Sequence, residues 1–396
     1  MSHVMNTYAR LPVSFERGEG VWLFDAQGKR YMDALAGVAV NALGHSHPVL
    51  VAALRDQVGK LIHTSNIYRI DSQEKLASRL AALSGMDQVF FCNSGAEANE
   101  AAIKIARYYG HNKKNIENPA IVVLEKSFHG RTLATLSATG SRKVQAGFEP
   151  LVSGFVRVPF DDLEAVKRVA ESNKNVVAVL AELVQGEGGV LVCGKDYLKG
   201  LREICDAHGW LLMLDEVQTG IGRTGQWFAF QHYGVTPDVM TLAKGLGGGV
   251  PIGACVAKGE AATLFKPGSH GSTFGGNLLA CAAALATLGI VEDEKLCQNA
   301  TDIGNYLRAG LARALAETPG IKDIRGQGML TGIELDRPCS ELVTAALDAG
   351  LLINVTADNV VRLVPPLTMT RAEAQQLIDG VAPLIRAFLA RPAAAG

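Results

Sequence analysis

The sequence predicts an α/β protein with a large domain, built on a mostly parallel central sheet flanked by helices, and a smaller α+β domain. Short apolar runs bounded by turn residues recur between residues 88 and 257, and they are typical of buried strands. Stretches with helical apolar spacing alternate with these runs, as in βαβ units. The pattern changes near residue 293, and a chain of 396 residues is long enough for two domains.

Residues 1–47 are expected to form an N-terminal segment that packs with the smaller domain. An apolar run, a glycine-containing turn and a second run predict a β-hairpin over residues 20–31. Apolar residues at helical spacing predict helices over residues 49–60 and 71–84.

The large domain is expected to span residues 48–293. Its buried strands are predicted at 88–92, 121–124, 176–180, 211–214, 239–242 and 253–257. Its helices are predicted at 99–109, 161–172, 197–208 and 260–265. The alanine-rich run 278–291 is shorter than the ~20 residues that span a bilayer, so it predicts a long buried helix.

The C-terminal small domain is expected over residues 294–396. Helices are predicted at 305–317, 340–349 and 371–390, and strands at 321–325, 331–334 and 360–363. Residues 391–396 are expected to be frayed.

Composition and charge exclude several classes of protein. The net charge is −1, which does not favour binding to nucleic acid or to an acidic membrane. The seven cysteines are scattered and form no C-x-x-C pair, which indicates reduced thiols and not a disulfide framework or a zinc site. The N-terminus has no apolar signal-peptide core, so we expect a cytoplasmic protein.

The stretch from Trp210 to Lys244 organises the rest of the chain. One apolar run ends in Asp215, a second ends in Lys244, and several glycines follow. A carboxylate and an ammonium at the ends of two buried strands are costly unless each has a partner. Pyridoxal phosphate would partner both, because it needs a carboxylate at its ring nitrogen and a lysine to form a Schiff base with its aldehyde.

If Asp215 and Lys244 bind a cofactor, further residues become candidates for the same site. Ser94 and Gly95 lie at a strand-to-helix junction, where free N–H groups attract anions, although an ordinary helix cap has the same sequence. Phe128 can stack on a planar cofactor and Arg131 can bind a carboxylate, but core packing and a surface position are equally compatible with these two residues.

Two glutamates support a site at this edge of the sheet, whereas a glycine motif suggests another class of enzyme. Glu182 and Glu187 follow a buried strand, at the edge of the sheet where ligands of α/β proteins bind. The segment from Gly220 to Gly225 matches the G-x-G-x-x-G fingerprint, so a nicotinamide-dependent oxidoreductase is a second functional class. The match lacks a clear following helix and an acid ~20 residues later, which argues against it.

A metal site is not expected. His45 and His47 are two residues apart, but no cysteine, aspartate or glutamate lies beside them at the spacing of metal ligands.

The chain resembles the class III, fold type I pyridoxal-phosphate aminotransferases, and within them the acetylornithine/ornithine branch. The resemblance covers nearly the whole sequence. The motifs that carry it are 44–48 (GHSHP), 93–98 (NSGAEA), 128–131 (FHGR), 185–187 (QGE), 215–220 (DEVQTG), 241–245 (TLAKG), 271–277 (GSTFGGN) and 362–367 (RLVPPL).

The resemblance implies a role for each matching residue. Lys244 would bind the cofactor covalently and then move a proton, while Asp215 would pair with the ring nitrogen. Gln218 would bind the phenolic oxygen, and the ring would lie between two hydrophobic side chains. The residues implied at the cofactor are Ser94, Gly95, Ala96, Phe128, His129, Asp215, Val217, Gln218, Lys244 and Thr273. Thr273 would come from a second subunit, which implies a homodimer with shared active sites.

The substrate residues implied are Arg131, Arg362, Glu187, Glu182 and Ser272. Two arginines suit the two carboxylates of glutamate or 2-oxoglutarate, and Glu187 would neutralise Arg362 when the second carboxylate is absent. That switch gives dual specificity in one pocket. Residues 38–41 are expected near its far end.

The implied activity is that of an N2-acetylornithine:2-oxoglutarate 5-aminotransferase of arginine synthesis, acting by a ping-pong mechanism. Succinylornithine, succinyldiaminopimelate, ornithine and 4-aminobutyrate stay open as amino donors, as does a share in lysine synthesis. A third functional class, a binding protein of this fold without catalysis, is disfavoured because Asp215, Gln218, Lys244 and both arginines are present.

Overall fold

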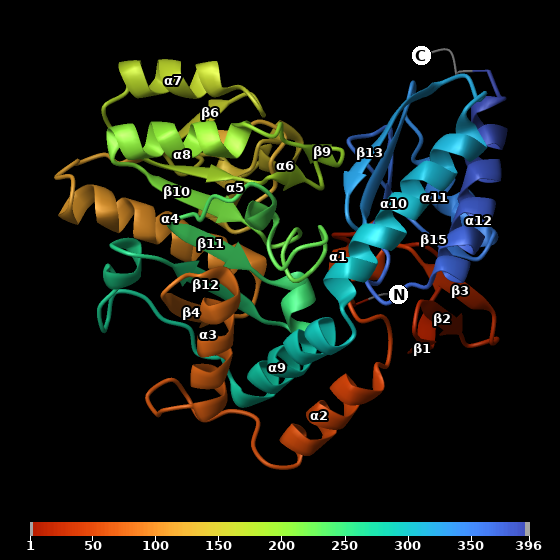
Figure 1. The fold of residues 1–396 in the computed structure, drawn as a ribbon, viewed down its shortest axis with the longest axis horizontal. Helices are drawn as coiled ribbons and strands as arrows, with labels where there is room; N and C mark the ends of the chain where they lie inside the picture. The colour runs from red at the N-terminus through yellow and green to blue at the C-terminus, as the bar shows by residue number, and fades with distance from the viewer. Residues whose placement is uncertain (1–2, 393–396) are drawn as a thin grey trace.

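The computed structural model describes residues 3–392 and has two parts that lie side by side (Figure 1). The larger part contains a seven-stranded sheet with the strand order β4-β12-β11-β10-β7-β5-β6. The strands are β4 (Gln88–Cys92), β5 (Ala120–Leu124), β6 (Phe155–Val158), β7 (Val176–Ala181), β10 (Leu211–Asp215), β11 (Val239–Leu242) and β12 (Gly253–Ala257). Only β12 runs antiparallel to its neighbours, so the predicted mostly parallel sheet is confirmed.

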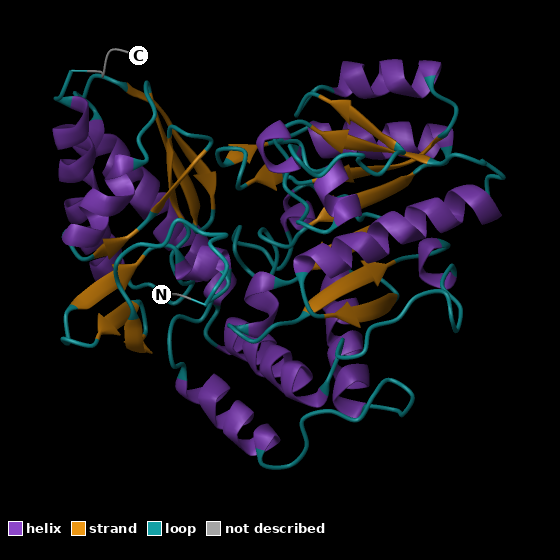
Figure 2. Ribbon diagram, turned by 180° about the vertical axis from the view of Figure 1, so that it is seen from behind, coloured by secondary structure: helices purple, strands orange, loops and turns teal. Residues whose placement is uncertain are grey.

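Helices cover both faces of this sheet, which explains why its strands are apolar runs without alternation. Successive residues of β5 point to opposite faces: Ile121 packs in the core cluster with helix α4 (Gly95–Asn112), and Val122 packs in the cluster with α7 (Leu163–Ser172) and α8 (Tyr197–His208). Figure 2 shows α4 on one side of the sheet and α7 and α8 on the other.

Three helices pack at the lower edge of the larger part as drawn in Figure 1. They are α2 (Pro48–Val58), α3 (Asp71–Ser84) and the alanine-rich α9 (Leu278–Asp293). Asn277 caps α9, because its side chain accepts a hydrogen bond from the N–H of Ala280 at 2.9 Å. The long buried helix predicted from composition is confirmed.

The smaller part is built on two four-stranded sheets. One contains β13 (Ile321–Gln327), β14 (Leu330–Leu335), β17 (Val360–Leu363) and β16 (Asn354–Thr356). The other contains β1 (Phe15–Glu19), β2 (Trp22–Asp25), β3 (Arg30–Asp33) and β15 (Leu351–Leu352). Because β3 pairs in parallel with β15, the N-terminal segment is hydrogen-bonded to the C-terminal part of the chain. The domain limits at residues 47 and 293 stay a prediction.

Three helices cover the smaller sheets: α10 (Leu296–Leu315), α11 (Glu341–Asp348) and α12 (Arg371–Leu389). A capping box starts α12, in which Thr370 and Glu373 bind each other's backbone N–H. Residues 393–396 of the predicted frayed tail lie outside the described residues. Between residues 3 and 392 no helix is long and apolar enough to cross a membrane.

Two helix predictions need correction. The segment 260–265 forms only a short 3₁₀ turn, η3 (Ala261–Thr263), because six residues form too few helical hydrogen bonds to offset the cost of nucleating an α-helix. Helix α10 begins at Leu296, nine residues before the predicted start, because the left-handed residue Lys295 (φ 52°) turns the chain directly from α9 into α10. The edge strand β6 was not predicted from the sequence. The same holds for the short elements α1 (Ala36–Ala39), α5 (Leu133–Ala138), α6 (Arg142–Gln145), β8 (Val184–Gln185) and β9 (Leu191–Val192).

Candidate active site

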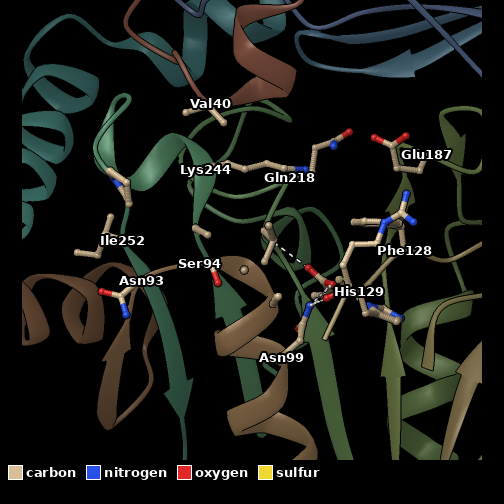
Figure 3. A pocket seen from close by; sticks show the side chains of 18 of the residues that line it. Val40, Asn93, Ser94, Asn99, Phe128, His129, Glu187, Gln218, Lys244 and Ile252 are labelled. Atoms are coloured by element: carbon tan, nitrogen blue, oxygen red, sulfur yellow. Dashed lines mark hydrogen bonds and ion pairs between the residues drawn. The ribbon is translucent and has the colours of Figure 1, made fainter. Parts of the chain in front are cut away.

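A cavity of about 450 Å³ opens at the carboxyl ends of the parallel strands, on the side that faces the smaller part. Ligands of open α/β sheets bind at this edge. Twelve of the residues singled out in the sequence line it (Figure 3): Ser94, Gly95, Ala96, Phe128, His129, Arg131, Glu182, Glu187, Asp215, Val217, Gln218 and Lys244.

The sheet brings Asp215 and Lys244 together. Strands β10 and β11 are parallel neighbours, and Asp215, the last residue of β10, lies opposite Thr241 in the register. Lys244 follows two residues after the end of β11, in the turn η2 (Lys244–Gly247), with a left-handed φ of 42°. A left-handed lysine is uncommon, and such backbone conformations concentrate at functional sites.

Asp215 is buried and held by three donors. Its Oδ2 atom lies 2.7 Å from Nδ1 of His129 and accepts a hydrogen bond from Nδ2 of Asn99 at 2.7 Å. Its Oδ1 atom accepts a hydrogen bond from the N–H of Val217 at 3.0 Å. The carboxylate is therefore fixed in one orientation. Its partners His129 and Asn99, which Figure 3 shows, line the cavity together with Asp215.

The start of helix α4 offers an anion site. The side chain of Ser94 caps the helix by accepting from the N–H of Glu97 at 3.2 Å. The N–H groups of Gly95 and Ala96 have no partner within residues 3–392 and belong to the first helical turn. A Cβ atom on Gly95 would lie 2.6 Å from Val217, so only glycine lets the helix end approach this wall of the cavity.

A buried arginine of the smaller part lies outside the cavity lining and contacts two residues that line the cavity. Arg362 of β17 is 1% exposed, and its Nη1 atom lies 2.6 Å from Oε1 of Glu187 and 3.5 Å from Oε1 of Gln218. Its Nε atom donates to Asn354 at 3.1 Å. Arg131 is exposed and lies over the ring of Phe128, with 5.7 Å between Cζ and the ring centroid. The two arginines therefore differ, since Arg362 is paired and buried while Arg131 is open to solvent.

Burial prepares Lys244 for proton transfer. Desolvation lowers the pKa of Lys244, and Arg362 lowers it further, while Glu187 and Asp215 act in the opposite direction. A lysine with a lowered pKa is a better base and nucleophile near neutral pH.

The pKa of Glu182 is raised, whereas that of Lys244 is lowered. Burial raises its pKa well above the usual value and the nearby Asp215 raises it further, although the N–H of Phe128 donates to Glu182 at 3.2 Å. The raised pKa favours the neutral carboxyl form of Glu182 in the folded protein. Glu182→Gln, which resembles that form, should therefore leave the rates at neutral pH near those of the wild type.

The pH dependence of stability tests this protonation state. Folded Glu182 keeps a proton that the unfolded chain releases above pH 4.5, so the free energy of unfolding falls as the pH rises from 4.5 towards the raised pKa. Glu182→Gln lacks this loss. We expect its Tm to rise relative to that of the wild type as the pH is raised above 4.5, and a difference that does not change with pH would contradict a raised pKa of Glu182.

The remaining sequence-derived candidates lie elsewhere. Ser272 and Thr273 are outside the cavity lining, although Oγ of Ser272 accepts from Asn93 at 3.2 Å and Asn93 lines the cavity. The segment from Gly220 to Gly225 forms turns after β10 and opens no helix, which removes its likeness to a dinucleotide fingerprint. His45 and His47 each contact a different carboxylate. Nε2 of His45 lies 2.8 Å from Oδ2 of Asp33, and Nε2 of His47 lies 3.0 Å from Oε1 of Glu294.

Several residues of the cavity were not predicted from the sequence, or were predicted only as part of a longer segment. Asn99 was seen as part of a helix and not as a site residue. Of the segment 38–41, the residue that lines the cavity is Val40, placed there by a left-handed turn at Ala36–Ala39. Asn93, which belongs to the motif 93–98 but was given no role, and Ile252, which no local sequence signal marks, also line the wall.

The donor set fits pyridoxal phosphate. A fixed carboxylate, a lysine of lowered pKa, two free N–H groups at a helix start and a flanking aromatic ring surround one cavity. These groups match the ring nitrogen, the aldehyde, the phosphate and the ring face of that cofactor.

Comparison with known proteins agrees with this arrangement. The chain matches the family described as Aminotransferase class-III over residues 4–385. The acetylornithine aminotransferase of Nitrosomonas europaea is 64% identical over 389 residues, which are 98% of this chain and 99% of that protein.

Solved structures give the same relationship. The ornithine aminotransferase of Toxoplasma gondii superposes with a TM-score of 0.94 at 36% identity, covering 98% of this chain and 93% of that one. A second structure of that enzyme, crystallised with oxidised glutathione and described as having partial occupancy of PLP at its active site, gives a TM-score of 0.93 at 36% identity, covering 97% and 92%. A family match over nearly the whole length, a shared fold and a cavity built for the cofactor lead to one conclusion: the chain belongs to the class-III aminotransferases, enzymes of fold type I.

Proposed function

We propose that this enzyme is a pyridoxal-phosphate-dependent acetylornithine aminotransferase, which moves the 5-amino group of N2-acetylornithine to 2-oxoglutarate in arginine synthesis. The observation that carries the proposal is the 2.6 Å ion pair between the buried Arg362 and Glu187, which lines the cavity together with the exposed Arg131. The full-length likeness to enzymes named for acetylornithine supports the choice of amino donor.

The two substrates differ at the carbon that reacts. Glutamate carries a carboxylate on that carbon and a second one farther away. Acetylornithine has only the distant carboxylate, because its reacting amino group is on the terminal carbon. Arg131 therefore binds the distant carboxylate of both substrates, while Arg362 binds the near carboxylate of glutamate alone. When acetylornithine is bound, Glu187 neutralises Arg362.

The residues around the cofactor have separate roles in proton transfer and in binding the ring and the phosphate. When bound, pyridoxal phosphate supplies a carbon that takes and returns the amino group and a ring that withdraws electrons from the reacting bond. Lys244 moves the proton at the reacting carbon, and Asp215 holds the proton of the ring nitrogen. The N–H groups of Gly95 and Ala96 bind the phosphate, with Ser94 capping their helix.

The other residues orient and enclose the ring. Phe128 and Val217 flank it, and Gln218 binds its phenolic oxygen. His129 holds Asp215 from below through the 2.7 Å contact. The raised pKa of Glu182 favours its neutral form, which adds no charge to the substrate side of the cavity.

Arg362→Ala tests the assignment of the two arginines. The expected result is a loss of about 100-fold in the rate of the 2-oxoglutarate half-reaction, because a charged hydrogen-bonded pair with the substrate is lost. The acetylornithine half-reaction should change far less. Stopped-flow absorbance of each half-reaction measures both rates. Arg131→Ala serves as the matched variant and should slow both halves, and equal losses in Arg362→Ala would contradict the Glu187 switch.

A panel of amino donors tests the choice of substrate. Initial rates are compared for acetylornithine, succinylornithine, succinyldiaminopimelate, ornithine and 4-aminobutyrate at equal concentrations with 2-oxoglutarate. We expect the highest kcat/KM with acetylornithine. A higher value with ornithine would keep the mechanism and change the named substrate.

We also propose a homodimer with shared active sites, because Ser272 and Thr273 lie outside the cavity of their own chain. Their loop packs against the segment between α2 and α3: Asn66 donates to Ser272 O at 3.0 Å, and the rings of His63 and Phe274 are 5.2 Å apart.

Large apolar side chains are exposed on the same surface, and such patches mark interfaces. They are Leu61, Ile62, Ile67, Tyr68 and Phe274. Sedimentation equilibrium of the wild type and of Phe274→Asp tests this: we expect a dimer that the substitution weakens, and a monomeric wild type would contradict it. The seven cysteines are free, in keeping with the reducing cytoplasm that we propose as the location.

A further inference from the structure

Asn99 lies beneath the cavity in the second turn of α4 and is almost completely buried. Its Nδ2 atom donates to Oδ2 of Asp215 at 2.7 Å and to the carbonyl oxygen of His129 at 2.9 Å. Its Oδ1 atom accepts from the hydroxyl of Thr241 at 2.7 Å. A helix, a loop and a strand thus meet at one amide group (Figure 3 shows Asn99 and His129).

The partners of this amide permit only one orientation. Both contacts of Nδ2 are acceptors, a carboxylate and a carbonyl oxygen. Turning the amide by 180° would place Oδ1 against these two oxygens and remove one donor from each, which is costly in a buried site. The hydroxyl of Thr241 stabilises the observed orientation, because it donates a hydrogen bond to Oδ1 of Asn99. Thr241 also lies opposite Asp215 in the β10–β11 register, so the sheet places the hydroxyl beside the carboxylate.

Asn99 in turn fixes Asp215. Asn99 and His129 both engage Oδ2, and the Val217 N–H engages Oδ1. We propose that Asn99 and Thr241 are positioning residues that act through Asp215 on the ring nitrogen of the cofactor. The inference rests on the proposed role of Asp215.

The surroundings of Asp215 make its orientation important. Two more carboxyl groups, Glu182 and Glu216, lie near enough to influence Asp215, and burial raises the pKa of both. The basic groups that face it are His129 and Lys244, and Lys244 has a lowered pKa. Glu187 and Arg362 form a pair with each other beyond Lys244. Because acidic groups lie close to Asp215, its contacts with Asn99, His129 and Val217 decide how its carboxylate is oriented.

The test compares two substitutions at one position. Thr241→Val keeps the shape of the side chain and removes the hydroxyl, while Thr241→Ser keeps the hydroxyl. The holoenzyme of each is assayed for the dissociation constant of pyridoxal phosphate, the pH dependence of the cofactor's absorption, and the rate of each half-reaction.

For Thr241→Val we expect about tenfold weaker cofactor binding, a shifted pH profile and both half-reactions slowed by the same factor of about ten. Equal slowing is expected because both half-reactions use the ring nitrogen. Thr241→Ser should behave like the wild type. Asn99→Ala should cause a larger loss, about 100-fold, because Asp215 then loses a charged hydrogen bond.

Thr287→Val is the matched control, because Thr287 is buried in α9 and its hydroxyl has no hydrogen-bond partner among the residues described. It should change none of the three measurements. The inference is overturned if Thr241→Val keeps the wild-type pH profile and cofactor affinity, whether or not its Tm falls. It is also overturned if Thr241→Ser loses as much as Thr241→Val. A wild type that binds no pyridoxal phosphate would instead refute the proposed function.

Discussion

Replacing Lys244 by alanine is expected to slow both half-reactions by at least about 10⁴-fold, the upper range for loss of a positioned acid–base group. The reason is the combination of its place and its pKa. Lys244 lies at the end of β11 in a left-handed turn, lines the cavity with Asp215, and has a pKa lowered by burial and by Arg362. Solvent cannot replace a base held in this position.

Two measurements check this expectation. Stopped-flow absorbance gives the rate of each half-reaction, and the protein mass after borohydride treatment reports whether the cofactor was covalently attached. The wild type should gain the mass of the reduced cofactor, and Lys244→Ala should not. Lys258→Ala is the control, because Lys258 is exposed beyond β12. A Lys244→Ala enzyme with wild-type rates would mean that another lysine is the catalytic base.

Replacing Asp215 by asparagine is expected to slow both half-reactions by about 10²–10³-fold, comparable to the loss of one charge-stabilising group in other enzymes. Asparagine has the same size and can keep contacts with the neighbouring donors only by turning its amide oxygen towards them. It cannot supply the negative charge that holds a proton on the ring nitrogen. Asp215→Ala should lose at least as much and also bind the cofactor more weakly.

The two half-reactions should be affected equally in the Asp215 variants, since the ring nitrogen takes part in both. This separates Asp215 from Arg362, whose loss should fall on the 2-oxoglutarate half alone. Cofactor affinity and both rates are measured on the same preparations. A loss of less than about tenfold in Asp215→Asn would contradict its assignment, because one charged hydrogen bond alone accounts for that much.

The sequence predicted those site residues that lie at the ends of buried strands. Asp215 and Lys244 were visible because each ends an apolar run, and the carboxyl ends of neighbouring parallel strands meet at one edge. Ser94 and Gly95 were visible because helix starts have a characteristic composition. The sheet, its long helices and most of their limits follow from the same periodicities.

The rest depends on contacts between distant segments. Asn99 looks like any polar residue of a helix, and its partners Asp215 and Thr241 lie more than a hundred residues away. The left-handed turn that brings Val40 to the cavity contains Ala36, Val38 and Ala39, which ordinarily avoid positive φ. The N–H groups of Leu35 and Ala36 donate hydrogen bonds to the carboxylate of Asp33 and support that turn, and no local pattern signals these bonds.

The most direct test of the proposed mechanism is a spectral titration of the purified holoenzyme. N-acetylornithine is added first, without a keto acid, and 2-oxoglutarate is added after the change is complete. We predict that acetylornithine bleaches the long-wavelength absorption of the bound cofactor and that 2-oxoglutarate restores it, with one N-acetylglutamate semialdehyde formed per active site. A holoenzyme whose absorption does not respond to acetylornithine until 2-oxoglutarate is also present would contradict a ping-pong transfer through Lys244 and Asp215.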